Sequence, residues 1–198
     1  MKNKESGIVF DFAEGVEWDK FDETDFYQKH FKKMNGAKGV DFILKTKDSI
    51  ILIEVKNCFR FENENRWRIF PDNSKKETIA TKVDTDDRNS LDIEIPQKVS
   101  MTLACLIGAH SRPFYENPSD LLKPYFNFTK SNEVPSGSRR IKVVLFLEGD
   151  FSKRSLTQKA IMTRLGDKIK GQLSWLNCKV IVENIGTHKK DYYTARFE

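Results

Sequence analysis

The sequence of 198 residues contains few cysteines and histidines, and these do not form a disulfide or metal-binding pattern. The three cysteines are an odd number, lie far apart and include no Cys-x-x-Cys pair, which predicts reduced thiols in a cytoplasmic protein. The three histidines are equally scattered, and none has a second histidine one helical turn away. This spacing argues against a zinc site.

Long apolar runs and the common nucleotide-binding and nucleophile motifs are also absent. No hydrophobic stretch approaches the length that spans a bilayer, and the first ten residues lack the sustained apolar core of a secretion signal. No Walker-type loop, dinucleotide fingerprint, serine or cysteine nucleophile motif or internal repeat is visible. We therefore expect a protein that is neither membrane-bound nor exported, and acidic and basic side chains become the candidates for chemistry.

Composition sets the size of the core and the sign of the charge. With 38% hydrophobic residues the chain can bury one sizeable core, and we predict a single domain over residues 1–198. The formal net charge of +5 fits a polyanionic partner, although many ordinary proteins share it. Residues 1–30 hold four Lys and eight Asp or Glu, so the basic part of the chain follows them.

The most informative stretch covers residues 39–57. Two apolar runs, at 40–44 and 50–55, are separated by the polar residues 45–48, and this pattern predicts a β-hairpin of two largely buried strands. Three charged residues interrupt the apolar runs, namely Asp41, Glu54 and Lys56.

The alternation of side chains along a strand places these three charges together. Glu54 and Lys56 share one face, because residues two apart point the same way. If the loop is centred between residues 46 and 47, Asp41 faces Leu52 and lies diagonal to Glu54 on that same face. Diagonal neighbours are about 7–8 Å apart, close enough for two carboxylates to bind one divalent ion. A loop with an odd number of residues would separate them.

Two neighbouring buried carboxylates need a compensating positive charge, and Lys56 supplies only one. A bound cation would balance the site. A structural salt bridge at the end of a strand explains the same residues without any chemistry, so both interpretations stay open at this point.

The residues Val40-Asp41, followed by Ile53-Glu54-Val55-Lys56-Asn57, resemble the signature of the PD-(D/E)XK nuclease superfamily. This fold is shared by many restriction enzymes, junction resolvases and repair nucleases. The Glu-x-Lys half is intact, and Val40 replaces the proline that often precedes the aspartate. The resemblance implies an α/β fold with a restriction-endonuclease-like mixed central sheet flanked by helices. It also implies metal-dependent hydrolysis of phosphodiester bonds, with DNA as the expected substrate.

The resemblance further implies a role for each residue. Asp41, Glu54 and the Val55 carbonyl would bind Mg²⁺ or Mn²⁺, while Lys56 would position or activate the attacking water and offset charge on the phosphate. In this superfamily an acid from the first helix often joins the site, and the helix after the Glu-x-Lys strand supports it. The corresponding residues are Asp22, Glu23 and Asp25, then Gln97 and Lys98. An ordinary solvated helix start is the alternative for both groups.

Local patterns predict the elements around this hairpin. The expected order begins with an N-terminal hairpin over residues 7–21, a helix over 24–34, the hairpin over 39–57 and a two-stranded ribbon over 58–70. A helix over 96–109, a strand over 141–147, a helix over 155–176, and strands over 179–185 and 192–197 are expected to follow. Two long loop insertions are expected, over 71–90 and 111–138.

Basic side chains of the ribbon and of the late helix are candidate contacts for nucleic-acid phosphates. They are Arg60, Arg66 and Arg68 on the ribbon, and Lys159, Arg164 and Lys168 on the helix. Trp67 could stack on a base, although packing against the body of the protein explains it better. Solvated basic faces are common, so these residues also have an interpretation without a ligand.

The sequence therefore predicts a cytoplasmic metal-dependent nuclease that acts on DNA as a monomer or a homodimer. One competing hypothesis is a catalytically silent nucleic-acid-binding module on the same fold. Another is a protein-interaction module in which the acid cluster is only structural.

Overall fold

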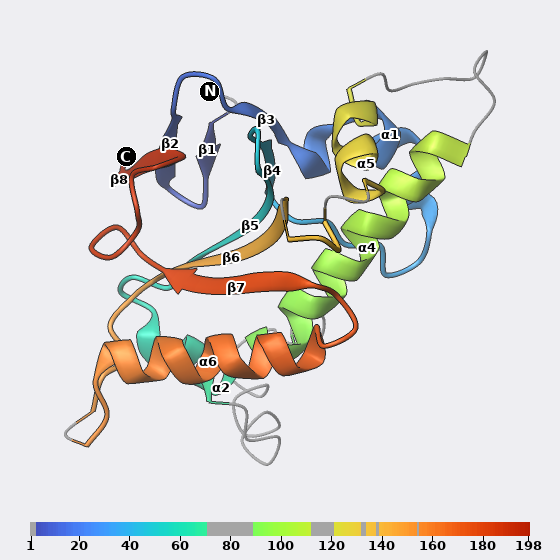
Figure 1. Cartoon of the computed structure of the whole chain (residues 1–198). Helices are drawn as coiled ribbons and strands as arrows, with labels where there is room; N and C mark the ends of the chain where they lie inside the picture. Colours follow the sequence, from blue (N-terminus) through green and yellow to red (C-terminus); the bar gives the residue numbers. More distant parts are fainter. Residues whose placement is uncertain (1–2, 71–88, 112–120, 132–133, 138, 154) are drawn as a thin grey trace.

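The computed structural model describes residues 3–70, 89–111, 121–131, 134–137, 139–153 and 155–198. It shows a mixed α/β architecture with two β-sheets (Figure 1). A five-stranded sheet has the strand order β3-β4-β5-β6-β7, and a three-stranded sheet has the order β1-β2-β8. The expected α/β class with a mixed sheet is confirmed, whereas the second sheet was not expected.

The element bounds are as follows. The strands are β1 (Lys4–Glu5), β2 (Ile8–Phe12), β3 (Glu17–Lys20), β4 (Phe42–Lys45), β5 (Ser49–Asn57), β6 (Arg140–Glu148), β7 (Cys178–Glu183) and β8 (Tyr193–Phe197). The α-helices are α1 (Asp25–Lys29), α2 (Glu62–Ile69), α4 (Leu91–Ser111), α5 (Lys123–Thr129) and α6 (Gln158–Gln172). Two 3₁₀ helices, η1 (Phe21–Glu23) and η2 (Phe31–Lys33), flank α1.

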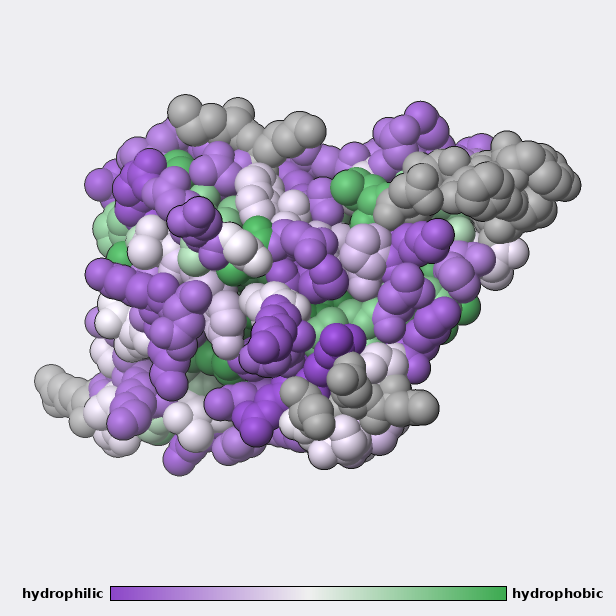
Figure 2. Space-filling view, turned by 45° about the horizontal axis from the view of Figure 1, so that its top comes forward, coloured by the Kyte–Doolittle hydropathy of each residue, from purple (hydrophilic) through white to green (hydrophobic). Residues whose placement is uncertain are grey.

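Strand β5 is the centre of the larger sheet. It pairs antiparallel with β4 and parallel with β6, so it has no free edge. One face of the sheet packs against apolar residues of α4, α5 and α6, and the other face packs against the three-stranded sheet. Both faces of β5 are therefore covered, which explains its nearly continuous apolar sequence. On the outside, Figure 2 shows a largely hydrophilic face with only small hydrophobic patches.

The register of the β4–β5 hairpin differs from the expected one by two residues. Phe42 pairs with Ile53, because the turn is centred one residue later than expected. A shift of two residues leaves every side chain on its expected face, whereas a shift of one would have moved it to the other face. Asp41, which immediately precedes β4, therefore stays on the face of Glu54, and it lies across from Glu54 instead of diagonal to it.

The prediction of an N-terminal hairpin is wrong. Strand β2 pairs with β1 and β8, whereas β3 pairs with β4 in the other sheet. The alternating pattern located both strands, but a local pattern does not encode a partner near the other end of the chain. The aromatic residues still meet, since the rings of Phe12 and Trp18 stack 4.3 Å apart where the two sheets face each other.

Two further expected elements differ in kind or length. The helix expected over 24–34 is divided into α1 and η2, because the backbone leaves the helical conformation at His30. The prediction of a two-stranded ribbon over 58–70 is wrong, because a turn at 58–61 leads into helix α2. Acidic residues in the first turn of α2 and arginines in its last turn suit a helix dipole, and this signal outweighs the apolar alternation.

The second half of the chain follows the expected order more closely. Strand β6 joins the sheet beside the hairpin, α6 follows it, and β7 continues the sheet, as expected. Helix α4 begins at Leu91, so Pro96 lies inside the helix and not at its start. The loop expected over 71–90 lies almost wholly outside the described residues, and α5 occupies part of the loop expected over 111–138. Among the described residues, none of the helices is long and apolar enough to cross a membrane.

Phe10 provides a test of how the two sheets pack together. Its buried side chain contacts the rings of Phe42, Phe146 and Tyr193 at centroid distances of 5.1 to 5.4 Å. Phe10→Ala should lower the free energy of unfolding by about 3–5 kcal/mol, since it removes this ring from a packed core. Urea denaturation measures the effect, with Ile107→Ala on the exposed side of α4 as a control that should change it by less than about 0.5 kcal/mol. Equal effects would contradict this packing.

Candidate functional site

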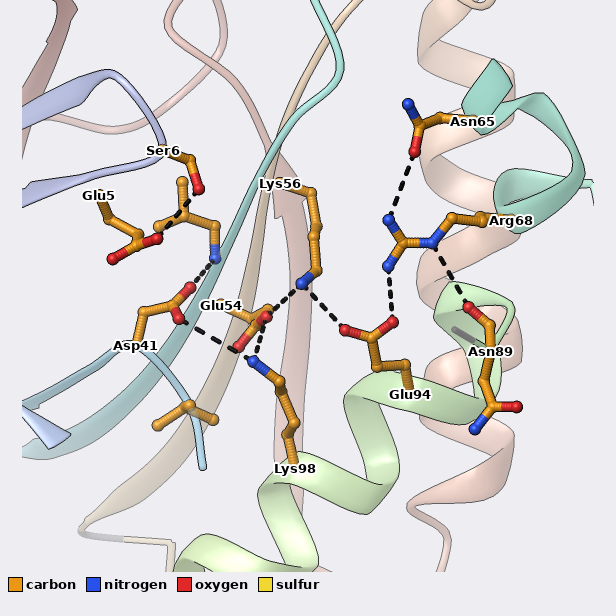
Figure 3. Close-up of polar contacts among 12 residues, drawn as sticks. Glu5, Ser6, Asp41, Glu54, Lys56, Asn65, Arg68, Asn89, Glu94 and Lys98 are labelled. Carbon is orange, nitrogen blue, oxygen red and sulfur yellow. Dashed lines mark hydrogen bonds and ion pairs between the residues drawn. The ribbon is translucent and has the colours of Figure 1, made fainter. Parts of the chain in front are cut away.

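Two buried carboxylates converge where strand β4 begins (Figure 3). Glu54 is 1% exposed and Asp41 is 8% exposed. The Val55 N–H donates to Asp41 Oδ2 at 2.7 Å, which fixes the Asp41 side chain against β5. The Lys98 ammonium lies 2.6 Å from Glu54 Oε1 and 3.9 Å from Asp41 Oδ1. Both carboxylates therefore contact the same cation.

The charged network continues from Glu54 toward helix α2. Lys56 Nζ lies 2.7 Å from Glu54 Oε1 and 2.9 Å from Glu94 Oε1. Arg68 in turn donates to Glu94 Oε2 at 2.6 Å. Opposite charges alternate along the network, and its three acidic and three basic side chains cancel in formal charge.

Four segments carry these side chains, with Asp41 just before β4 and Arg68 on α2. Strand β5 supplies Glu54 and Lys56 on one face, since they are two residues apart. Helix α4 supplies Glu94 and Lys98, which are four residues apart and therefore point to the same side of the helix. The Thr102 hydroxyl accepts the Val40 N–H at 3.1 Å, so α4 is also tied to the segment that carries Asp41.

An open cleft of about 830 Å³ is lined by every member of the network except the buried Glu54. Glu5 and Ser6 at the turn after β1 form one wall, so the three-stranded sheet contributes to the cleft although its strands lie far from β5 in sequence. Phe61 and Glu64 form the opposite wall, at the start of α2. A ligand in the cleft would contact Asp41, Lys56 and Lys98 directly.

Burial and neighbouring charges set the protonation of these groups. Burial and the Glu54 charge raise the pKa of Asp41 to about 8, against the opposing effect of Lys98. Burial alone would lower the pKa of Lys56, but the charges of Glu54 and Glu94 raise it overall, so the ammonium stays protonated. Burial likewise opposes ionisation of Glu94, yet Lys56 and Arg68 lower its pKa to about 2. The Asp41 carboxyl therefore holds a proton near neutral pH.

Of the three acids proposed from the first helix, the structure brings Asp22 closest to the network. Burial raises the pKa of Asp22, and the charges of Lys20 and Lys98 oppose that rise. Its Oδ1 atom is buried and has no hydrogen-bond partner within the described segments. Glu23 instead forms an ion pair with the partly buried Lys20 at 2.9 Å, and Asp25 forms one with the exposed Lys29 at 2.7 Å.

Helix α4 contributes one residue that was proposed from the sequence and one that was missed. Lys98 was proposed as a supporting residue and in fact contacts both carboxylates. Gln97 is exposed, and its side chain accepts from the amide of Asn89 at 3.5 Å. Glu94 was missed because the helix was expected to begin at Pro96. The acidic residues after Ser90 are a helix-start signal that would have found it.

The proposed phosphate contacts divide into three groups. Arg68 is buried against Glu94, and the Arg66 guanidinium donates to the Phe151 carbonyl at 3.4 Å. Arg60 is exposed in the turn beside the cleft, next to Phe61. The proposed residues of α6 are exposed on a surface away from the residues that line the cleft, and they are Lys159, Arg164 and Lys168. Trp67 is buried and packs against the body of the protein.

The sequence was compared with models of known protein families. A family model matches residues 24–195, so the chain belongs to a family of unknown function, DUF6661. The matched segment contains the whole charged network, but it does not include Glu5 and Ser6. Neither the curated proteins nor the solved structures gave a match. Because the family description states no activity, the functional argument depends on the geometry of the cleft.

Removing Glu94 should leave the buried cations Lys56 and Arg68 without their shared partner. Glu94→Ala should therefore lower the free energy of unfolding by about 3–5 kcal/mol, as expected when one member of a buried ion pair is lost. Urea denaturation measures the change. The matched control is Glu64→Ala, because Glu64 lines the same cleft but is exposed, and its loss should cost less than about 0.5 kcal/mol.

The raised pKa of Asp41 predicts a pH dependence of stability. The folded protein holds a proton on Asp41 up to about pH 8, whereas the unfolded chain releases it near the ordinary value of 3.8. The free energy of unfolding should therefore fall as the pH rises from about 4 to 8 and then become constant. Asp41→Asn should lack this decline, so the two stability curves should diverge across that range. Parallel stability curves for the wild type and Asp41→Asn would contradict the raised pKa of Asp41.

Proposed function

We propose that this protein is a metal-dependent nuclease that hydrolyses phosphodiester bonds, with DNA as its expected substrate, on a restriction-endonuclease-like fold. The observation that carries the proposal is the contact of two buried carboxylates, Asp41 and Glu54, with one cation, beside the ammonium of Lys56. The resemblance of these same residues to the PD-(D/E)XK signature supports it independently of their arrangement in space.

The donor atoms suit Mg²⁺ or Mn²⁺, since these ions prefer carboxylate and carbonyl oxygens. Among the described residues, the buried Glu54 Oε2 atom has no hydrogen-bond partner, and Asp41 holds a proton that a divalent ion would replace. The Lys98 ammonium occupies the position of such an ion against the two carboxylates. Asp41, Glu54 and the carbonyl of Val55, which also lines the cleft, would therefore hold the metal.

The carboxylates do not form a complete metal site in this conformation. Within the described parts of the chain, no three His, Cys, Asp or Glu side chains form a group that could hold a metal ion. Binding of the ion would require the Lys98 ammonium to leave the carboxylates. Asp22, whose buried Oδ1 has no hydrogen-bond partner in the part of the chain that the structure describes, is the further acid that could then approach the ion or receive Lys98.

A bound ion would polarise the phosphate and increase the acidity of a coordinated water. The positive charge of Lys56 would then act on the water or the phosphate. Because Glu54 and Glu94 keep its pKa above the ordinary value, Lys56 donates hydrogen bonds to a water or a phosphate oxygen and does not remove a proton. Glu94 holds the Lys56 ammonium in place, and Arg68 holds Glu94.

The catalytically silent nucleic-acid-binding module remains the second candidate. The observation that favours it is that every acid of the network already contacts a lysine or arginine without a bound ion. The two candidates differ in turnover, because only the nuclease cleaves its ligand.

Cleavage assays test the proposal with plasmid, linear and single-stranded DNA and with RNA, in Mg²⁺ or Mn²⁺ and then in EDTA. Wild-type protein should cleave at least one substrate, and EDTA should abolish the cleavage. Lys56→Met keeps most of the side-chain length but removes the charge, so it should lower the rate by about 10²-fold or more. Asp41→Asn should raise the metal concentration needed for activity as well as lowering the rate.

The matched control is Lys47→Met, which removes an exposed lysine from the turn at the other end of the same hairpin. It should cleave at the wild-type rate. Full activity in folded Lys56→Met would contradict the role of Lys56. Binding without cleavage by pure wild-type protein under every condition would favour the silent module.

A further inference from the structure

A turn beside the cleft exposes two phenylalanine side chains. Phe59 is 48% exposed and Phe61 is 61% exposed, and Phe61 lines the cleft together with Asp41 and Lys56. Exposed aromatic side chains that adjoin a polar cleft are typical of a binding surface. The turn follows the charged end of β5 directly, so recognition and the candidate chemistry lie within one short segment.

The backbone holds this turn in a defined conformation. Arg60, between the two phenylalanines, has a φ of 70°, a left-handed conformation that is uncommon outside glycine. The Cys58 N–H donates to the Glu148 carbonyl at 2.9 Å, and the Phe61 N–H donates to the Cys58 carbonyl at 2.9 Å. Local strain of this kind persists only where surrounding contacts fix it, and it is common at ligand sites.

Asn57 connects the turn to the opposite wall of the cleft. Its Oδ1 atom accepts the Phe59 N–H at 3.1 Å, and its Nδ2 atom donates to the Ser6 carbonyl at 2.9 Å. The backbone that carries the aromatic side chains is therefore tied to the wall formed by Glu5 and Ser6. A surface that is already ordered loses little conformational entropy when a ligand binds.

The chemistry of the turn suits a planar aromatic ligand. The Arg60 guanidinium lies over the Phe59 ring at 5.4 Å, and the ring of Phe59 lies 5.3 Å from that of Phe197. Nucleobases stack on aromatic rings and on guanidinium planes alike. Inside a duplex both faces of a base are covered by its neighbours, so only an unpaired base can use such a surface.

We propose that Phe59 and Phe61 form a stacking platform for an unpaired nucleobase next to the phosphate bound in the cleft. The substrate class is then a single strand, or a strand with an extruded base. This inference rests on the proposed function of the cleft, but the stacking itself requires neither metal nor turnover.

Binding measurements in EDTA test the platform without cleavage. Fluorescence anisotropy compares a labelled single-stranded oligodeoxynucleotide, the same strand carrying abasic sites, and the corresponding duplex. Wild-type protein should bind the intact single strand about tenfold or more tightly than either of the other two. A 2-aminopurine base in the single strand should be quenched on binding, which reports stacking directly.

Substitutions at Phe61 separate stacking from ordinary apolar contact. Phe61→Leu keeps an apolar side chain but loses the ring, so it should weaken single-strand binding about tenfold and leave duplex binding unchanged. Phe61→Tyr keeps the ring and should bind as the wild type does. The matched control is Trp175→Ala, because Trp175 is 59% exposed but follows the far end of α6, away from the cleft.

The outcomes distinguish the platform from the nuclease proposal. If wild-type protein binds the single strand and Phe61→Leu binds it equally well, the platform is wrong and the nuclease proposal is unaffected. Equal affinity of the wild-type protein for intact and abasic strands would also contradict the platform and leave the nuclease proposal unaffected. If wild-type protein neither binds nor cleaves any nucleic acid, the proposed function fails and the platform fails with it.

Discussion

The burial of the Glu54 carboxylate in the central strand is the constraint on which the site depends. A single buried charge costs several kcal/mol unless it is paired, and two lysines, Lys56 and Lys98, contact the same Oε1 atom. These lysines are themselves largely buried and need partners, which Glu94 and Asp41 supply. One buried acid thus accounts for an alternating network that joins β5, α2 and α4.

This network also explains the position of the surrounding elements. Helix α4 must approach β5 closely enough for Glu94 and Lys98 to reach it, and the contact of Thr102 with Val40 maintains that approach further along the helix. The other face of β5 is apolar and is covered by the three-stranded sheet. The polar groups are therefore confined to one end of one face, where the cleft opens to solvent.

The proposed chemistry and the proposed recognition share a single short segment. Lys56 ends the charged part of β5, and the turn that carries Phe59 and Phe61 follows it at once. Asn57 and the Cys58 backbone anchor that turn to the β1–β2 turn and to β6. In the proposed complex, the position of an unpaired base would thereby fix the position of its phosphate relative to Lys56 and the two carboxylates.

The sequence by itself determined the hairpin and the shared face of Asp41, Glu54 and Lys56. Alternation along a strand is a local property, and it survived a register two residues from the expected one. Only the tertiary structure decided the rest of the site, because its contacts join distant segments. Glu94 and Lys98 of α4 contact β5, and Arg68 of α2 contacts Glu94. The tertiary structure also decided the pairing of β2 with β8 and the position of Glu5 in the wall of the cleft. Local patterns locate strands and helices, whereas pairing over long distances in sequence depends on which faces can be buried together.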